Sequence, residues 1–366
     1  MIPARADRET ALEIARASYR GISLYNPDRS PARIDLSDNT NTWGVAPAVE
    51  AALREASIAT VTRYPNLYAA ALKDALGGYL GVGADRIVTG CGSDDVLDSA
   101  IRAFAEPGDV IALPDPSFAA IGIFAQMNAL RPAVVPLTAS LDLDAETMLA
   151  TDARIIYICS PNNPTGGSMS RAAVERVVER ARGVVIIDEA YAEFAGVDFL
   201  DLLERSDRVL ISRTMSKAFG LAGLRVGYAA GAPALVAEVE KSRGPYKVNA
   251  LAERAALAAL GPGLSWAREH VTQAVENRER LADELRGRGL EPLPSAANFV
   301  CVPVADADAR GKRMRAHGVA VRPFEGMPAI GPLAATNGSA LRISVGPWEM
   351  IEAALDALDA TAEGTP

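Results

Sequence analysis

Short apolar runs alternate with amphipathic helical patterns between about residues 45 and 230. The apolar runs are rich in β-branched residues, which is typical of strands covered on both faces. They occupy residues 87–89, 110–113, 133–135, 155–159, 184–187, 209–211 and 226–229. Helical patterns occupy residues 46–56, 67–80, 94–105, 117–129 and 171–182. This alternation predicts an α/β fold whose mostly parallel seven-stranded sheet is sandwiched between helices.

The pattern changes after residue 231 and indicates a small α+β domain. Helices are predicted over residues 232–242, 250–260, 264–286 and 348–360. Short strands are predicted over residues 298–302, 320–322 and 341–345. We therefore predict three parts, namely an N-terminal arm (1–40) that packs with the small domain, a large domain (41–240) and a small C-terminal domain (241–366).

The composition is that of an ordinary globular enzyme and limits the classes of partner. Of the 366 residues, 49% are apolar and 23% are charged, and the formal net charge is −9. This acidic balance argues against nucleic acid or an anionic membrane as a partner, because both require a basic surface. Residues 1–7 lack an apolar core of signal-peptide length, and no segment is long enough to span a membrane. We therefore expect a cytoplasmic protein.

The cysteines and histidines argue against a metal site. Cys91, Cys159 and Cys301 have no metal-ligand spacing and cannot form a disulfide framework. His270 and His317 lie in polar, helix-like contexts, where surface or structural roles are usual. Zinc chemistry and histidine-based acid–base catalysis are therefore not expected.

A lysine follows the apolar run 209–211, within the sequence SRTMSKAFG (212–220). A lysine at the end of a buried strand has a lowered pKa, and its neutral amine can form a Schiff base with a carbonyl. The hydroxyl residues beside Lys217, together with Arg225, offer hydrogen-bond donors and positive charge to a phosphate. An aldehyde and a phosphate on one molecule suggest pyridoxal 5′-phosphate (PLP). The alternative interpretation is a structural lysine at the end of a strand.

A glycine-rich motif, TGCGSDD (89–95), lies between a predicted strand and a predicted helix. Glycines let the backbone approach a ligand closely, and a helix N-terminus supplies unpaired N–H groups. Ser93 adds a hydroxyl donor, so the motif has the form of a phosphate cradle. Asp94 and Asp95 are also ordinary helix-capping residues, which leaves a purely structural interpretation open.

Two further polar motifs follow predicted strands. The sequence SPNNPTGG (160–167) is either a simple turn or a rigid support that aims an asparagine amide at a fixed point. Asp188 follows the run 184–187, where a carboxylate is costly unless it meets a cation or a donor. In a PLP site that partner is the pyridinium N–H, and an ionised Asp188 keeps this nitrogen protonated. Tyr191, three residues further on, can donate to the ring oxygen O3′.

In this chain order, the motifs resemble those of the fold-type I, PLP-dependent aminotransferases of class I/II. The resemblance runs from about residue 36 to residue 345 and is strongest to the histidinol-phosphate aminotransferase subgroup. Its most diagnostic part is the sequence SKAFGLAGLR (216–225). It implies the fold of that family, with a large PLP-binding domain and a small C-terminal domain.

The resemblance also implies a role for each motif around the cofactor. Lys217 would bond to PLP through a Schiff base and later move a proton between the substrate Cα and the cofactor C4′. Asp188 would pair with the pyridine nitrogen, and Asn163 and Tyr191 would hold O3′. The residues implied to hold the cofactor phosphate are Ser93, Asp94, Thr214, Ser216 and Arg225.

Two aromatic residues match further family positions. Phe118 falls where an aromatic ring stacks on the cofactor, and it replaces the tyrosine that is common in the subgroup. Tyr64 matches a tyrosine that reaches the cofactor phosphate of the neighbouring subunit. The resemblance therefore implies a homodimer with shared active sites.

The residues implied to bind the substrate come from three separate segments. Arg342 matches the arginine that grips the anionic group of the substrate, a carboxylate in most of the class. Arg322 matches an arginine that helps to bind a substrate phosphate in histidinol-phosphate enzymes, although a surface role at a strand edge is the alternative. Tyr25 is matched to an arm tyrosine that closes over the substrate.

The loop NTNTWG (39–44) departs from the subgroup, which usually has Asn-Glu-Asn-Pro followed by an aromatic residue and glycine. Asn41 and Trp43 are the residues of this loop that we expect on the substrate side. The change leaves transamination intact but alters the surface that covers the substrate side chain. The segment 326–338 also borders the expected site.

We therefore predict an aminotransferase that moves an amino group between an amino acid, or histidinol phosphate, and a 2-oxo acid by ping-pong chemistry. The donor stays open between histidinol phosphate and an aromatic or unusual amino acid of a specialised pathway. The same fold hosts decarboxylases of the threonine-phosphate type and cyclising or replacement enzymes. Assays of both oxo-acid formation and CO₂ release would distinguish these classes from an aminotransferase. A regulator with an aminotransferase-like sensor domain would need a DNA-binding module, and about 35 residues precede the predicted body.

Overall fold

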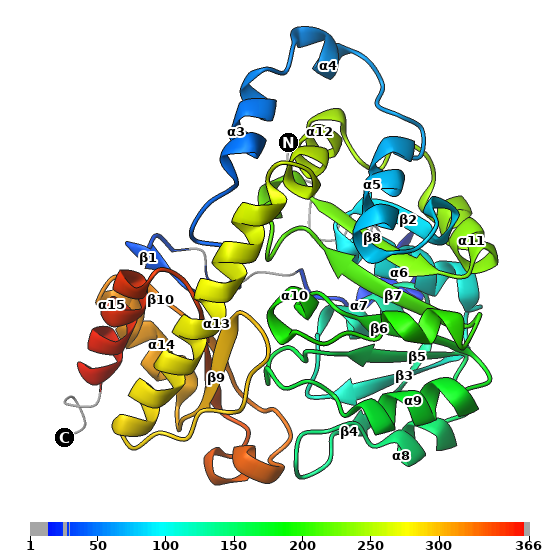
Figure 1. Ribbon diagram of the computed structural model, residues 1–366. Coiled ribbons are helices and arrows are strands. Elements are labelled where there is room, and N and C mark those ends of the chain that lie inside the picture. Colours follow the sequence, from blue (N-terminus) through cyan, green and yellow to red (C-terminus); the bar gives the residue numbers. More distant parts are fainter. Residues whose placement is uncertain (1–13, 25–27, 29, 362–366) are drawn as a thin grey trace.

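The computed structural model describes residues 14–24, 28 and 30–361. Its largest sheet is built from β2 (Ile87–Cys91), β3 (Val110–Asp115), β4 (Arg131–Pro136), β5 (Ile155–Cys159), β6 (Val184–Asp188), β7 (Val209–Thr214) and β8 (Val226–Gly231). The strand order is β2-β8-β7-β6-β5-β3-β4 (Figure 1). Neighbours from β7 to β4 are parallel, whereas β8 runs antiparallel to both β2 and β7. The predicted mostly parallel seven-stranded sheet is confirmed.

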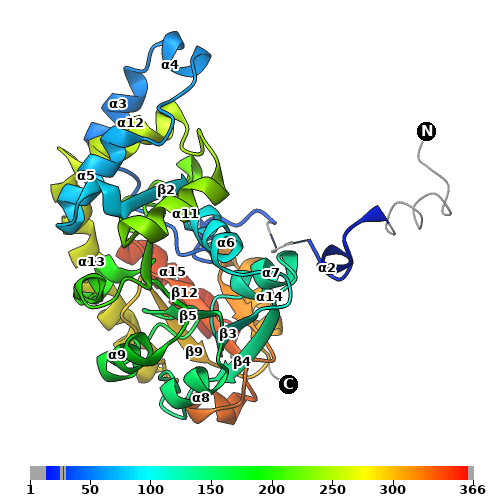
Figure 2. The ribbon, with the colours of Figure 1, turned by 90° about the vertical axis from the view of Figure 1, so that its right-hand side faces the viewer.

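Two apolar layers cover this sheet because successive strand residues point to opposite faces. Ile155 and Tyr157 of β5 pack into one layer, and Ile156 and Ile158 pack into the other. The first layer is completed by α6 (Ser93–Phe104), α7 (Ala120–Met127) and α11 (Pro233–Arg243). The second is completed by α5 (Ala70–Leu80), α8 (Ala145–Ala150), α9 (Arg171–Arg180), α10 (Ala192–Ala195) and α12 (Ala250–Leu260). Figure 2 shows α6 and α7 on one side of the sheet and α8 and α9 on the other.

A second, antiparallel sheet has the order β11-β12-β9 and forms the centre of the C-terminal part. Its strands are β9 (Phe299–Pro303), β11 (Arg322–Phe324) and β12 (Ala340–Ser344). The helices around it are α13 (Leu264–Gly287), α14 (Ala307–Ala316) and α15 (Trp348–Asp359). This is the small α+β domain that the sequence predicts.

The single strand predicted over residues 320–322 is wrong. The chain instead forms β10 (Val319–Ala320), which pairs in parallel with β1 (Ile34–Asp35), and then β11, which pairs with β12. The continuous segment 319–324 therefore serves two sheets, which a local pattern does not reveal.

Five helices of the described chain were not predicted, namely α2 (Ala17–Arg20), α4 (Ile58–Thr62), α8, α10 and α14. In α14 the buried positions are Ala307, Gly311 and Met314, so its inner face contains few large apolar residues. Such a helix lacks the apolar periodicity on which sequence prediction depends. The remaining helix of the N-terminal half is α3 (Pro47–Arg54), two residues shorter than predicted at its C-terminus.

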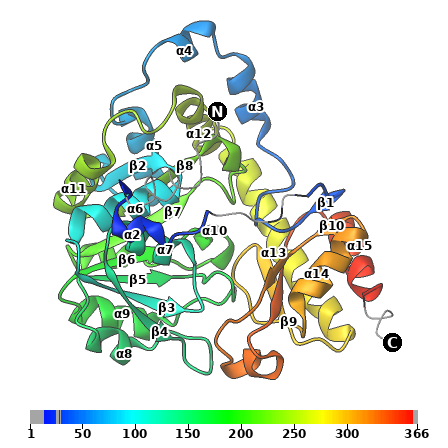
Figure 3. The same cartoon turned by 180° about the vertical axis from the view of Figure 1, so that it is seen from behind.

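The N-terminal arm contacts both parts of the molecule. The pairing of β1 with β10 and an ion pair of 2.9 Å between Asp28 and Arg315 join it to the small domain. Its short helix α2 lies beside α7, which covers the large sheet (Figure 3).

Another group of helices is formed by α12, which packs against α3 and α5. The predicted domain boundaries at residues 40 and 240 stay predictions. Within the described ranges, no helix is both long and apolar enough to cross a bilayer.

Candidate active site

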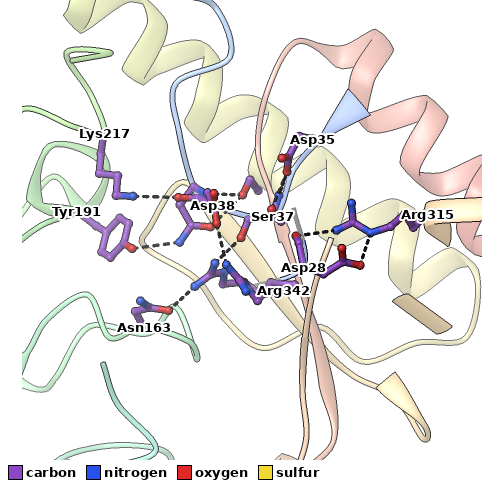
Figure 4. A network of polar contacts seen from close by, with 12 residues as sticks. Asp28, Asp35, Ser37, Asp38, Asn163, Tyr191, Lys217, Arg315 and Arg342 are labelled. Carbon is purple, nitrogen blue, oxygen red and sulfur yellow. Dashed lines mark hydrogen bonds and ion pairs between the residues drawn. The ribbon is translucent and has the colours of Figure 1, made fainter. Parts of the chain in front are cut away.

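The candidate site lies at the carboxyl ends of the central parallel strands, where ligands bind in open α/β sheets. Asp188 is the last residue of β6, and Lys217 lies three residues beyond the end of β7. The small domain contributes Arg342 from β12, and the segment Ser37–Asn39 that follows β1 lies between the two parts (Figure 4).

The amine of Lys217 points toward the segment that follows β1. Its Nζ donates a hydrogen bond of 3.0 Å to the backbone oxygen of Asp38 (Figure 4). It also lies 5.8 Å from the centre of the Tyr191 ring. Burial, followed by the positive charge of Arg342, lowers the pKa of Lys217 to about 8. Neutral amine, the form that attacks a carbonyl, is therefore abundant near pH 8.

A buried carboxylate ends β6. Asp188 is only 3% exposed. Its oxygens accept hydrogen bonds from two neutral donors, the Tyr157 hydroxyl at 2.8 Å and the backbone N–H of Ala190 at 3.2 Å. Burial raises the pKa of Asp188 to about 6, because it disfavours the charged form. A cationic N–H donor beside the carboxylate would oppose this shift, so the position fits such a group.

The hydroxyl of Tyr191 is fixed by a residue far away in the sequence. The side-chain amide of Asn39 donates a hydrogen bond of 3.0 Å to it, and burial raises the pKa of Tyr191 to about 12. Asn39 has a φ of +55° and forms two hydrogen bonds with Ser344 Oγ, at 2.8 Å and 2.9 Å. The phenol is thereby linked through Asn39 to β12 of the small domain.

The β2–α6 junction and the turn before β8 form a tight backbone cradle. Gly92 has a φ of +83°, and a Cβ added there would lie 2.5 Å from Nη2 of Arg225. A Cβ at Gly227 would lie 2.1 Å from the backbone nitrogen of Ser93, so only glycine fits. Arg225 also pairs with Asp94 at 3.3 Å. The first N–H groups of α6, the Ser93 hydroxyl and the Arg225 guanidinium are thus close together, which suits a phosphate.

The turn that carries Lys217 is held at both ends. Thr214 Oγ1 accepts a hydrogen bond of 3.2 Å from the Ser216 backbone and donates one of 3.4 Å to the oxygen of Val226. Asn41 donates a hydrogen bond of 3.0 Å to the oxygen of Ala218 from the N-terminal loop. Thr214 and Ser216 therefore belong to the hydrogen-bonded turn that carries Lys217, and their cofactor role stays a prediction.

Arg342 presents a buried guanidinium to the site. Its Nη1 donates to Asn163 Oδ1 and its Nη2 to the backbone oxygen of Ser37, both at 2.6 Å (Figure 4). The rings of Phe299 and Phe324 lie 5.3 Å and 5.4 Å from the guanidinium carbon. Burial lowers the pKa of Arg342, and its buried Nε has no hydrogen-bond partner among the described residues. A buried free donor of this kind suits an incoming anion.

Arg322 is the direct cross-strand neighbour of Arg342 in the β11–β12 pair. Its Nη2 forms an ion pair of 2.8 Å with Asp38 Oδ1. Asp38 thus forms an ion pair with Arg322 through its carboxylate and accepts the hydrogen bond of Lys217 with its backbone oxygen. The second arginine of the site therefore has an acidic partner.

The two aromatic residues implied to contact a cofactor lie in different surroundings. Phe118 is partly buried and packs against the apolar layer of α6 and α7. Tyr64 is 84% exposed, and its ring stacks on Tyr246 with centroids 5.0 Å apart. An exposed pair of stacked tyrosines is a surface that a second chain can cover.

The remaining residues predicted to bind the substrate are Asn41, Trp43 and Tyr25. The ring of Trp43 meets His270 of α13 edge-on, with centroids 5.9 Å apart, and its backbone N–H donates to Asn41 Oδ1 at 3.0 Å. Tyr25 lies outside the described residues.

The site fits PLP on the chemistry of its own groups. It combines a neutral-capable amine, a buried carboxylate that lacks a cationic neighbour at hydrogen-bond distance among the described residues, and a glycine cradle at a helix N-terminus. The charges of Asp94 and Arg225 in the cradle act on the Lys217 amine, as do those of Arg342 and Asp38. The amine therefore senses the charges of both the glycine cradle and the Arg342 guanidinium.

Comparison with known proteins identifies the family of the chain. Residues 32–358 match the family model described as aminotransferase class I and II, so the chain belongs to this family. It is 31% identical to a histidinol-phosphate aminotransferase of Thermoanaerobacter pseudethanolicus, over 92% of this chain and 95% of that protein. It is 38% identical to an aromatic amino acid aminotransferase of Rhodococcus jostii, over 84% and 88% of the two chains.

A solved structure has the same fold. It is the histidinol-phosphate aminotransferase of Sinorhizobium meliloti in complex with PLP, with a TM-score of 0.82 and 24% identity, covering 96% of this chain and 98% of that one. The predicted family and fold-type I architecture are thus confirmed, and the chain is a PLP-dependent transaminase.

Four residues of the site were not predicted from the sequence, namely Ser37, Asp38, Asn39 and Tyr157. Tyr157 lies inside an apolar strand, where an aromatic residue is usually a core residue. The other three begin two residues after the end of a two-residue strand, and a cluster of short polar side chains at that place is the only local signal.

Proposed function

We propose that the chain transfers an amino group between an amino acid and a 2-oxo acid, with Lys217 as the catalytic amine. The observation that carries the proposal is the position of Lys217, whose amine has a pKa near 8 and lies among Tyr191, Arg342 and the Asp188 strand end. PLP, when bound, withdraws electrons from the substrate Cα and thereby makes its proton removable.

Each residue around the cofactor would have a defined task. Asp188 would accept the N–H of the pyridine ring, and Asn163 and Tyr191 would hold the ring oxygen O3′. Phe118 would lie against the ring. The cradle residues that would hold the phosphate are Ser93, Asp94, Thr214, Ser216 and Arg225.

Lys217 would also carry the proton of the reaction. Its Nζ would take the proton from the substrate Cα and return it on the other side of the transferred nitrogen. A lysine with a pKa near 8 suits both steps, because it gains and loses a proton near neutral pH. Its hydrogen bond to the Asp38 oxygen would orient the amine between these steps.

The carboxylate of the substrate would bind to Arg342. The planar guanidinium matches a carboxylate in a two-point arrangement, and the free Nε of Arg342 supports such a role. Trp43 and Asn41 would border the substrate side chain, with Arg322 at the far side of the arginine pair.

Similar proteins of two specificities support two candidate classes of amino donor. Names among the similar proteins include histidinol-phosphate and aromatic amino acid aminotransferases. We propose that one of these two classes, or an unusual amino acid of similar size, is the donor. A panel of amino donors with 2-oxoglutarate, histidinol phosphate included, tests this choice, and measurement of CO₂ release in the same assays identifies a decarboxylase.

We further propose that the enzyme acts in the cytoplasm as a homodimer in which Tyr64 reaches the neighbouring site. The exposure of Tyr64 and its stacking on Tyr246 support this assembly. The central experiment is the Lys217→Ala exchange, which should abolish the yellow colour of the purified protein and its turnover. Normal transamination by this variant would contradict the assignment.

A further inference from the structure

Two arginines of the small domain face the candidate site from neighbouring strands. Arg322 and Arg342 are directly paired in the register of β11 and β12, so their side chains leave the same face of the sheet. An isolated pair of this kind would present two positive charges to a ligand. Such a doubly positive site would suit a phosphate monoester, which carries a charge of about −1.5 to −2 at pH 7.

Asp38 changes this charge balance. Its carboxylate is 2.8 Å from Nη2 of Arg322, and the side chains of both residues are mostly buried. The hydrogen bonds of Arg342 at Nη1 and Nη2 instead go to neutral acceptors, the amide oxygen of Asn163 and the backbone oxygen of Ser37. The three charged side chains together therefore leave one positive charge, which Arg342 carries.

The position of Asp38 is fixed by its neighbours on either side (Figure 4). The backbone oxygens of Ser37 and Asp38 accept hydrogen bonds from Arg342 and Lys217. The backbone N–H of Asn39 donates a hydrogen bond to Ser344 Oγ. These bonds fix the backbone on which the Asp38 side chain stands, and the ion pair with Arg322 holds its carboxylate beside the arginine pair. A phosphate placed between the arginines would therefore meet the negative charge of Asp38.

We propose that Asp38 is a specificity-determining residue that selects substrates with a carboxylate, rather than a phosphate monoester, at the arginine pair. By neutralising Arg322 it matches the site to a single negative charge, and it repels a dianion. The inference rests on the proposed function and names the substrate class of that site, an α-amino acid. It makes histidinol phosphate the disfavoured member of the two donor classes.

The test compares the holoenzyme with its Asp38→Asn and Asp38→Glu variants. For each, kcat/KM is measured with phenylalanine and with histidinol phosphate as donors to 2-oxoglutarate. We expect the wild type to prefer phenylalanine. Asp38→Asn should shift the ratio toward histidinol phosphate by about tenfold, because it removes a negative charge from beside Arg322. Asp38→Glu keeps the charge and should keep the wild-type preference.

A binding measurement that needs no turnover accompanies the rates. The dissociation constants of 3-phenylpropionate and of phenethyl phosphate, which lack an amino group, are measured by calorimetry. Asp38→Asn should tighten binding of the phosphate ester relative to the carboxylate by about the same factor. Adding Arg322→Gln to Asp38→Asn should remove this gain, since the freed arginine is its source.

The inference is overturned if the wild type prefers histidinol phosphate, or if Asp38→Asn leaves both ratios unchanged. Failure of the proposed function has a different signature. In that case no amino donor would be converted to its oxo acid by the wild type, whatever the ratio of the two dissociation constants.

Discussion

The hydroxyl of Tyr157 donates a hydrogen bond of 2.8 Å to Asp188 Oδ2, across the neighbouring strands β5 and β6. Tyr157 lies two residues before Cys159, the partner of Asp188 in the strand register, so both side chains leave the same face of the sheet. This contact stabilises the charged form of a carboxylate that burial disfavours.

Tyr157→Phe should therefore weaken cofactor binding. Loss of the hydrogen bond raises the pKa of Asp188 above about 6 and leaves less carboxylate for the pyridine N–H. A hydrogen bond to a charged group contributes about 1.5–3 kcal/mol, so we expect a loss of about tenfold or more in PLP affinity. Spectroscopic titration of the cofactor-free protein with PLP measures it. Tyr228→Phe is the matched control, because the buried Tyr228 hydroxyl has no hydrogen-bond partner in the described chain.

Asp188→Asn should stabilise the cofactor-free protein above pH 6. The pKa of Asp188 is about 6 in the folded chain and 3.8 in the reference state, so the folded chain binds more protons between these values. Its stability therefore falls as the pH rises from about 4 to 6, by about 3 kcal/mol for two pKa units. Urea unfolding of both proteins from pH 4 to 8 should give curves that converge at low pH. Parallel curves would contradict the assigned cause.

The rate at which the cofactor-free protein captures PLP should rise through pH 8. Burial lowers the pKa of Lys217 from 10.5 to about 8, so its reactive neutral form is half-populated there. A solvated lysine would reach this point about two pH units later. The measurement is the rate of colour formation between pH 6 and 10. A rate that keeps rising only above pH 10 would show that Lys217 is not perturbed.

Arg342→Lys should raise the KM for an amino acid by about 100-fold and change kcat much less. Lysine keeps the positive charge but loses the planar two-point contact with a carboxylate and leaves Asn163 and Ser37 without their donor. Steady-state kinetics at saturating 2-oxo acid tests this. Arg313→Lys, on the exposed side of α14, is the control and should match the wild type. Equal KM values for all three proteins would place the anion site elsewhere.

Mixing two impaired variants tests the shared site. If Tyr64 serves the neighbouring chain, a mixed dimer of Tyr64→Ala and Lys217→Ala has one complete site. Subunit exchange between equal amounts should then restore about a quarter of the wild-type sites, since half of the dimers are mixed. Activity is followed over time after mixing. If no activity returns although mixed dimers form, Tyr64 acts within its own chain or has no role.

The sheet and the residues at its strand ends could be predicted because their signals are local. Apolar runs predicted all seven strands, Asp188 directly follows one of them, and Lys217 lies a few residues beyond the end of another. The lysine and the carboxylate come together because parallel strands end at the same edge.

The contacts between distant segments could not be predicted in this way. Asn39 and Ser344 are 305 residues apart, and nothing in either local sequence names its partner. Tyr157 looks like a core aromatic residue until the strand register places it beside Asp188. The ion pair of Asp38 with Arg322 depends on how β10 and β11 divide one apolar segment between two sheets.

The pairing of β1 with β10 consists of two residue pairs, Ile34 with Val319 and Asp35 with Ala320. It sets the register for the next residues, in which Ser37, Asp38 and Asn39 each reach a different partner. An insertion or deletion of one residue here would shift this register, so that all three residues would lose their present hydrogen-bond partners together. Exchange of side chains at this segment should therefore be able to change the preferred amino substrate, whereas a change in its length should disrupt the site.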